Sequence, residues 1–129
     1  MNERYLFDTN AVVALLALTP SLVSKIQYAS VTHIPSVALG ELYFGALNSA
    51  QVARKLARSE VIASNFPVLD CDTETARVYG ALKARLRVRG RPIPDNDLWI
   101  AALTVQHDLI LLTRNAHFEA IETARIEQW

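Results

Sequence analysis

The chain has 129 residues, 51% of them hydrophobic, which suits a single domain, 1–129, with a real core. Its 13 Lys and Arg balance 13 Asp and Glu, so net charge gives no argument for nucleic-acid binding, which must come from local patches. Cys71 is the single cysteine, which excludes an internal disulfide framework, and the apolar run 11–18 is shorter than the roughly 20 residues of a membrane span. We therefore expect a cytoplasmic protein with no membrane contact.

Short apolar runs alternate with longer helical patterns along the chain. In chain order they predict a strand at 5–7, helices at 10–18 and 21–29, a strand at 31–34, helices at 37–47 and 50–64, a strand at 67–69, a helix capped by Thr73 that ends near 88, a helix that ends near 107, a strand at 109–112, a short helix at 116–121 and a strand at 125–128. Strands that alternate with helices, without hairpin signals, indicate a mostly parallel sheet. The predicted fold class is α/β, with three layers (α/β/α) and a central sheet of four or five strands. In such folds, ligands bind beyond the carboxyl ends of the strands.

Acidic residues recur next to these predicted strand ends. Asp8 directly follows the apolar run YLF, and Glu41 is the only charged residue in PSVALGELYFGAL. In PIPDNDLWIAAL we assign Asp95 or Asn96 to capping the helix and Asp97 to the sheet edge, because Asp97 lies one turn before the apolar stripe. Two alternatives stay open here, namely a plain turn or helix-cap role for Asp8 and an exposed helix position for Glu41.

The predicted strand LILL is followed by Thr113, Arg114 and Asn115, so three carboxylates and an amide from four segments reach one edge. Carboxylates a few Å apart repel by several kcal/mol at an effective dielectric of about 20, so they stay ionised together only with a cation. Oxygen ligands suit Mg²⁺ or Mn²⁺, whereas Zn²⁺ prefers His or Cys. A metal held by a few carboxylates is typical of phosphodiester chemistry, and this is the chemistry that the pattern indicates.

Four motifs, in this order, resemble those of one protein family. The motifs LFDTN, ALGELYFGA, PDNDLWIAA and LLTRNAHF, with a final strand that ends in Trp129, resemble a PIN-domain protein, specifically a VapC-type ribonuclease toxin of a type II (VapBC) toxin–antitoxin pair. The resemblance implies a PIN-like domain and a metal-dependent endoribonuclease that hydrolyses phosphodiester bonds of a structured RNA, a tRNA or rRNA. It also implies a homodimer and a VapB-type antitoxin as partner.

The resemblance also assigns roles to individual residues. Asp8, Glu41 and Asp97 match the acidic positions of the family and are the expected ligands of Mg²⁺ or Mn²⁺. Asn115 stands where many relatives carry Asp and others Asn, and Thr113 stands where a hydroxyl commonly supports the site. These five residues are the candidate catalytic residues.

The densest basic segment, KARLRVRGR at 83–91, runs into the Asp97 block without an intervening acid. Arginines at such a place are candidates for holding RNA phosphates beside the metal. The candidates are Arg85, Arg87, Arg89 and Arg91, together with Arg114. The alternative is a solvated helix end whose cations interact favourably with the helix dipole.

Other functions remain as alternatives. A phosphatase of the haloacid-dehalogenase type also begins with an apolar strand that ends in Asp, but it needs a second Asp two residues later, where this chain has Asn10. A PIN-fold binding module that is catalytically weak or directed at DNA is the other alternative. Asn115 keeps it open, because an amide brings no charge to the site.

Overall fold

Residues 3–129 of the computed structural model contain the strands and helices that the sequence predicts. In chain order they are β1 (Arg4–Phe7), α1 (Thr9–Leu16), α2 (Pro20–Ile26), β2 (Val31–Pro35), α3 (Ser36–Leu47), α4 (Val52–Asn65), β3 (Val68–Leu69), α5 (Thr73–Val88), α6 (Asp95–Gln106), β4 (Ile110–Leu112), the 3-10 helix η1 (Ala116–Ala120) and β5 (Arg125–Glu127). The largest difference from the prediction is at α2, which ends at Ile26 rather than at 29. Hydrophobic periodicity therefore located the elements, although their ends differ by a few residues.

The strands form one sheet in the order β3-β2-β1-β4-β5, and every pairing is parallel. The prediction of a mostly parallel sheet of four or five strands is thus confirmed. β1 lies at the centre, with β2 on one side and β4 on the other. The chain leaves β1 toward β2 and later returns to β4, so a crevice opens at the carboxyl ends of these strands, where ligands bind in open α/β sheets.

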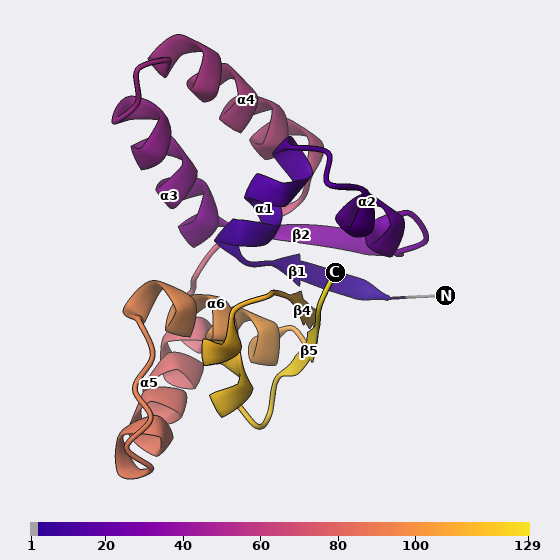
Figure 1. Ribbon diagram of the computed structural model, residues 1–129. Coiled ribbons are helices and arrows are strands. Elements are labelled where there is room, and N and C mark those ends of the chain that lie inside the picture. Colours follow the sequence, from indigo (N-terminus) through magenta and orange to yellow (C-terminus); the bar gives the residue numbers. More distant parts are fainter. Residues whose placement is uncertain (1–2) are drawn as a thin grey trace.

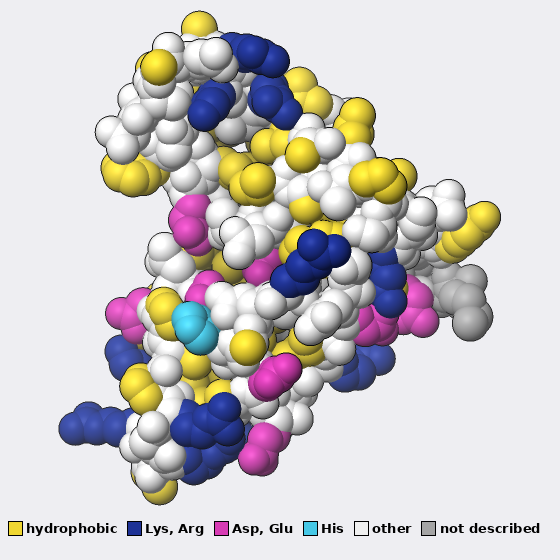
Figure 2. Space-filling model, viewed as in Figure 1, with side chains coloured by type: hydrophobic (Ala, Val, Ile, Leu, Met, Phe, Trp, Pro, Cys, Tyr) yellow, Lys and Arg dark blue, Asp and Glu magenta, His cyan; other side chains and the backbone are white. Residues whose placement is uncertain are grey.

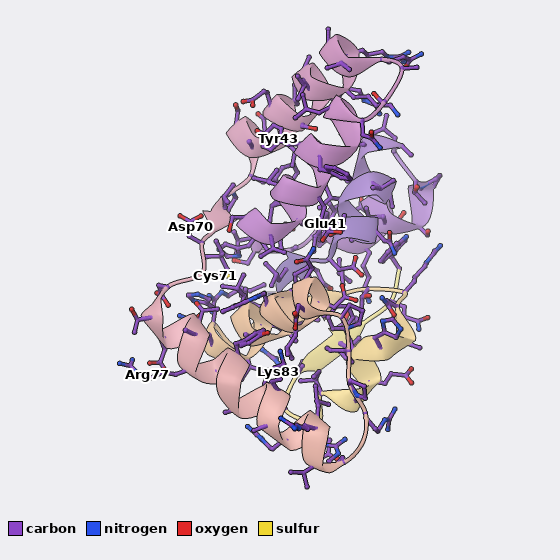
Figure 3. The ribbon with its side chains drawn as sticks, turned by 90° about the vertical axis from the view of Figure 1, so that its left-hand side faces the viewer. Glu41, Tyr43, Asp70, Cys71, Arg77 and Lys83 are labelled. Carbon is purple, nitrogen blue, oxygen red and sulfur yellow. The ribbon has the colours of Figure 1, made fainter. Side chains whose placement is uncertain are left out.

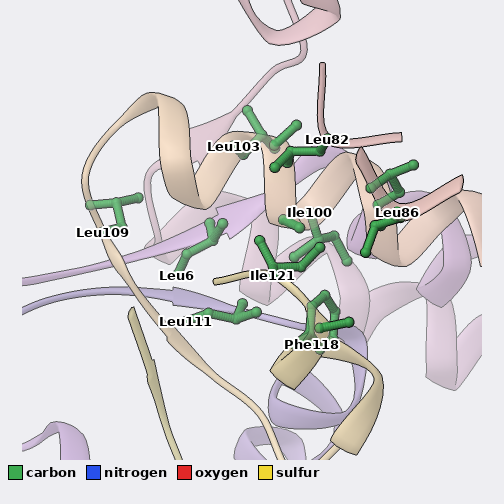
Figure 4. Packing of buried hydrophobic residues seen from close by; sticks show 13 residues of the cluster. Leu6, Leu82, Leu86, Ile100, Leu103, Leu109, Leu111, Phe118 and Ile121 are labelled. Atoms are coloured by element: carbon green, nitrogen blue, oxygen red, sulfur yellow. The ribbon is translucent and has the colours of Figure 1, made fainter. Parts of the chain in front are cut away.

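Helices cover both faces of the sheet, which gives the three layers that were predicted. α1 to α4 lie on one face, and α5, α6 and η1 lie on the other (Figure 1). The pleat of β1 sends Leu6 to one face and Tyr5 and Phe7 to the opposite face, since side chains alternate along a strand. Leu6 packs in a cluster with Leu103 and with side chains from α5, β4 and η1 (Figure 4). Both faces of the central strand β1 are therefore buried. This packing fixes the orientation of the strand and with it the position of its carboxyl end.

The helix starts differ from two of the predicted caps. Asp72, rather than the Thr after it, caps α5, because its side chain accepts a hydrogen bond from the Thr75 amide at 2.9 Å in a reciprocal capping box. Pro94 is the N-cap residue of α6, with no side-chain cap bond, so capping by Asp95 or Asn96 is wrong. Asp95 instead accepts a hydrogen bond from the Tyr79 hydroxyl at 2.9 Å.

In the described part of the chain, no single helix is long and apolar enough to cross a membrane. α1 and α2 together reach the required length and hydropathy, but a bend of 107° separates them. Val12 of α1 and Leu22 of α2 are fully buried within this domain.

Candidate active site

Asp8 lies directly after β1, at the carboxyl edge of the central strand. Its Oδ1 accepts a hydrogen bond from the Ala11 amide at 2.8 Å, so it caps α1 as the simpler alternative held. Its Oδ2 accepts a hydrogen bond from the Thr113 hydroxyl at 2.5 Å, beyond the end of β4. The Asp8 residue is only 3% exposed. The Asp8 carboxylate therefore has two roles. Its Oδ1 caps α1, and its Oδ2 bonds to Thr113 at the edge of the sheet.

Glu41 reaches the same edge from the second turn of α3. The Thr9 hydroxyl, one residue after Asp8, donates a hydrogen bond to Glu41 Oε1 at 2.8 Å. α3 and α6 lie side by side, and Figure 3 shows Glu41 on the part of α3 near α6. Glu41 is thus half-buried and held beside the end of β1, rather than at an exposed helix position.

Asp97 enters the edge from the first turn of α6. Its Oδ2 accepts a hydrogen bond from the Asn115 side-chain amide at 3.4 Å and lies 3.5 Å from His117 Nδ1. Asn115 in turn caps η1 through its Oδ1, which accepts a hydrogen bond from the His117 backbone amide at 2.9 Å. The Asn115 backbone amide donates to Thr113 Oγ1 at 2.9 Å. The Thr113 hydroxyl therefore connects the Asp8 carboxylate to the segment that holds Asp97.

The carboxylates at this edge influence one another electrostatically. Burial is the main reason that the pKa of Asp8 is raised above its ordinary value. The negative charges of Asp97 and Glu41 raise the pKa further, whereas the hydrogen bonds from Thr113 and Ala11 lower it. A cation at this edge would favour the ionised form of Asp8, because it would offset both the desolvation and the repulsion.

The donor set fits a hard divalent cation in its chemistry. Asp8, Glu41 and Asp97 offer carboxylate oxygens, the ligand type that Mg²⁺ and Mn²⁺ prefer. Within residues 3–129, however, no three Asp, Glu, His or Cys side chains are already arranged as a metal-binding group. Each carboxylate is instead engaged by a neighbouring hydroxyl or amide, as described above. Metal binding by these residues stays a prediction.

The chain as a whole is similar to known proteins. A model of the PIN domain matches residues 5–123. Ribonuclease VapC2 of Haemophilus influenzae is 33% identical over 129 residues, which cover 98% of each chain. The chain belongs to the PIN-domain family, among its VapC proteins. The tRNA(fMet)-specific endonuclease VapC of Salmonella typhimurium is 32% identical over 129 residues, 98% of each chain. The DNA-bound VapBC structure from Salmonella typhimurium has a TM-score of 0.87 and 30% identity, covering 100% of this chain and 99% of that one.

Membership of the PIN-domain family confirms the resemblance seen in the four sequence motifs. It also excludes the haloacid-dehalogenase-type phosphatase, whose second catalytic Asp has Asn10 in its place here. The motif residues Asp8, Glu41, Asp97, Thr113 and Asn115 all lie at one edge of this PIN domain.

The five candidate arginines of this VapC-family chain divide into two groups. Arg89 donates to the Ala120 carbonyl at 3.1 Å and lies 3.4 Å from a Glu122 carboxylate oxygen. Arg114 donates to the Trp129 carbonyl through Nε at 3.0 Å and stacks over the Trp129 ring at 4.7 Å. Both guanidinium groups thus hold the fold together, which competes with the predicted contact to RNA.

The second group of arginines is available to a ligand. Arg85, Arg87 and Arg91 are exposed, and their side chains make no hydrogen bond or ion pair to any residue that the structure describes. Arg85 and Arg87 lie on the last turn of α5, and Arg91 follows it. Only these three remain candidates for free phosphate ligands.

Sequence reasoning missed an apolar groove of about 470 Å³ in this PIN domain. Its walls come from α1, α3 and α4, and include Val13, Leu16 and Leu42. Lys55 lines it as well, and Glu41 of the candidate site also borders it. No single motif signals such a groove, because its wall residues come from three separate helices.

His117 was also missed as a site residue. The three histidines have no ligand-like spacing in the sequence, yet His117 lies 3.5 Å from the Asp97 carboxylate. Its place follows from the sharp turn of η1 after Asn115, which returns the chain to the start of α6. The sequence signal that could have indicated His117 is its position two residues after Asn115, in the polar segment that follows β4.

Proposed function

We propose that this PIN-domain protein is a metal-dependent endoribonuclease, the toxin of a type II toxin–antitoxin pair, that hydrolyses phosphodiester bonds of a structured RNA, a tRNA or rRNA. The observation that carries the proposal is the meeting of three carboxylates from β1, α3 and α6 at one crevice. The names of two relatives support it, one a ribonuclease and the other a tRNA(fMet)-specific endonuclease. Asn115 in place of an acid is compatible with hydrolysis through one metal rather than two.

In this proposal Asp8, Glu41 and Asp97 hold Mg²⁺ or Mn²⁺. The bound ion would polarise the scissile phosphate and lower the pKa of the attacking water. The chain's own polar groups orient the ligands. The Thr113 hydroxyl restricts rotation of Asp8, and the Thr9 hydroxyl does the same for Glu41. Such outer hydrogen bonds typically change metal affinity or activity by about 10–100-fold.

The protein partner is proposed to be a VapB-type antitoxin that occupies the groove between α1, α3 and α4. Several related solved structures are VapBC complexes, two of them at 30% identity. The α1 and α3 sides of the groove are mainly apolar, its α4 side carries Lys55, Arg58 and Ser59, and it reaches Glu41 and Thr9 at the candidate site. A helix with an apolar face fits a groove of this kind. An antitoxin bound there would end next to the carboxylates and would block access to them.

The decisive test is cleavage of total cellular RNA by purified, antitoxin-free protein with Mg²⁺, with Mn²⁺ and with EDTA. We expect discrete fragments that disappear with EDTA and fall by at least about 100-fold in Asp97→Asn, because a charged ligand is lost. Asp95→Asn is the matched control, since Asp95 lies two residues away and binds Tyr79 and Lys83 instead of the site. The control variant is expected to cleave like wild type.

Two outcomes would redirect the proposal. Fragments from DNA but not from RNA would favour the DNA-directed alternative. Absence of cleavage by well-folded wild-type protein on either nucleic acid would favour a PIN-fold binding module, with Asn115 as the first residue to change to Asp.

A further inference from the structure

A second hollow adjoins the carboxylates on the side opposite the groove. It has a volume of about 360 Å³ and lies between the segment after α5 and the 3-10 helix η1. Arg91 and His117 supply its polar lining, and Ile93, Ala116 and Ala120 supply apolar lining. We call it the Arg91 pocket. His117 belongs both to this pocket and to the site, because its Nδ1 lies 3.5 Å from Asp97 Oδ2.

The walls of the Arg91 pocket are fixed by the backbone. Gly90 ends α5 with a positive φ of 65°, and the Arg91 amide then bonds back to the Leu86 carbonyl at 2.9 Å. A non-glycine residue would be strained at that φ. The Arg89 side chain crosses to the Ala120 carbonyl at 3.1 Å and so ties α5 to η1. The pocket is therefore built by the fold rather than by one movable side chain.

The charge in the Arg91 pocket is available to an anion. The Arg91 side chain is exposed and has no hydrogen-bond or ion-pair partner among residues 3–129, unlike its neighbour Arg89. Arg87, on the last turn of α5, lies near it in sequence and is equally unengaged. The pocket thus offers a cation next to apolar surface, and its volume lies in the range of small-ligand sites.

We propose that the Arg91 pocket binds the nucleotide adjacent to the scissile phosphate of the RNA, with Arg91 on a backbone phosphate and the apolar wall against the base. The proposal rests on the function proposed above and deepens it, since it gives the RNA a direction. In this proposal the RNA strand runs from the carboxylates past His117 toward the end of α5, away from the groove. A phosphate contact positions RNA without reading its sequence, whereas the apolar wall tolerates any base face.

The test measures binding of a fluorescently labelled RNA hairpin with a single-stranded loop, in EDTA so that no cleavage interferes. Arg91→Gln removes the charge, and Ala116→Trp fills the pocket from an exposed position without changing charge. Arg54→Gln is the matched control, because Arg54 is exposed on α4, in the other helical layer. Far-UV circular dichroism and thermal unfolding check that each variant is folded.

We expect Arg91→Gln and Ala116→Trp each to raise the Kd for RNA by about fivefold or more, with Arg54→Gln within about twofold of wild type. Arg91→Gln should also reduce the slope of log Kd against log salt by about 0.7, because one phosphate contact is lost, whereas Ala116→Trp should leave the slope unchanged. If wild type binds and cleaves RNA while both variants behave like Arg54→Gln, the pocket is wrong and the nuclease proposal stands. If wild type neither binds nor cleaves RNA, both proposals are wrong.

Discussion

The two helical layers of this domain present different surfaces to solvent. The layer of α1 to α4 exposes apolar side chains, among them Val13, which lines the groove, at 50% and Val61 at 58% exposure. The layer of α5 and α6 carries the unengaged arginines Arg85, Arg87 and Arg91. Figure 2 shows magenta carboxylates near the middle of this face, yellow apolar patches above them, and dark-blue basic groups both at the lower end and at the top. A net charge of zero therefore conceals local apolar and basic patches, with Arg54, Lys55 and Arg58 of α4 exposed on the first layer as well.

This difference teaches how one site can serve two partners. Apolar surface suits a protein helix, while arginines suit phosphates. Glu41 borders the groove on one side of the carboxylates, and His117 borders the Arg91 pocket on the other. On the outer face of α3, Phe44 and Leu47 are also exposed, by 69% and 63%. An exposed apolar helix face of this kind is the feature on which the prediction of a homodimer rests.

The largest expected effect comes from filling the groove. Gly45 lines it, and a Cβ at this position meets nothing within 4 Å, so Gly45→Trp places an indole in the groove without a backbone clash. We expect antitoxin affinity to fall by about 100-fold, or ~2.7 kcal/mol, as for a central interface residue. RNA cleavage should be unchanged. Calorimetry with a VapB-type antitoxin, beside the RNA assay, measures both.

The control for this variant is Gly80→Trp on α5, where a Cβ also meets nothing within 4 Å. It makes the same change on the other layer and should leave antitoxin affinity within about twofold. Equal losses in the two variants, or no loss in either, would mean that the groove is not the antitoxin surface.

An intermediate effect is expected from the basic layer. The double variant Arg85→Gln with Arg87→Gln should weaken RNA binding by about tenfold and lower the salt slope by about 1.4, because two phosphate contacts are lost. Antitoxin affinity should not change. The control pair Arg54→Gln with Arg125→Gln removes the same charge elsewhere. If RNA affinity falls equally in both pairs, the effect comes from the change in net charge, and the arginines of α5 have no specific role.

The smallest effect concerns the carboxylates between the two surfaces. Burial raises the pKa of Asp8 in the folded protein, so the ionised carboxylate costs folding free energy at any pH above that raised pKa. In EDTA at pH 7.5, Asp8→Asn should therefore stabilise the fold, because the neutral amide avoids the cost of burying a charge. As pH falls through the raised pKa, wild type becomes protonated and the difference should shrink. Urea unfolding from pH 4 to pH 8 measures it.

Asp95→Asn is the control with the opposite sign. The hydrogen bonds from Tyr79 and then Lys83 lower the pKa of the exposed Asp95 carboxyl, so its ionised form favours folding above the ordinary pKa. Its loss should leave stability unchanged or slightly lower at pH 7.5. An Asp8→Asn variant that is no more stable than wild type at pH 7.5 would contradict the burial cost, and the smaller repulsion, argued for the ionised Asp8 carboxylate.

Much of the candidate site followed from sequence because parallel strands end at a common edge. That rule placed Asp8 after β1 and Glu41 shortly after β2, whereas Asp97, at the start of α6, was placed by its position one turn before an apolar stripe. The contacts that the arginines make could not be predicted from the sequence. Arg89 and Arg114 bind backbone carbonyl groups of Ala120 and Trp129, and a sequence does not show where a distant carbonyl will lie.

Helix caps were the other failure, and the reason is local. Asp72 and the Thr after it both have side chains that can cap a helix, so the sequence alone could not decide which of these two neighbours caps α5. The pair Asp95 and Asp97 looked like one cap and one site residue. In the fold, Asp95 is recruited by Tyr79 and Lys83 on α5, a tertiary contact that no spacing within its own segment reveals.

The bond between Asp8 and Thr113 joins residues that are 105 positions apart in the chain. Ribosomes add about 5–20 residues per second, so Thr113 is made roughly 5–20 s after Asp8. The backbone amide of Thr113 is in turn held by the Glu127 carbonyl, which is made later still. A growing chain therefore carries Asp8 without the hydroxyl that orients it until synthesis is nearly over. If the chain does cleave RNA, this order of assembly keeps the nascent protein from attacking the translation machinery that is producing it.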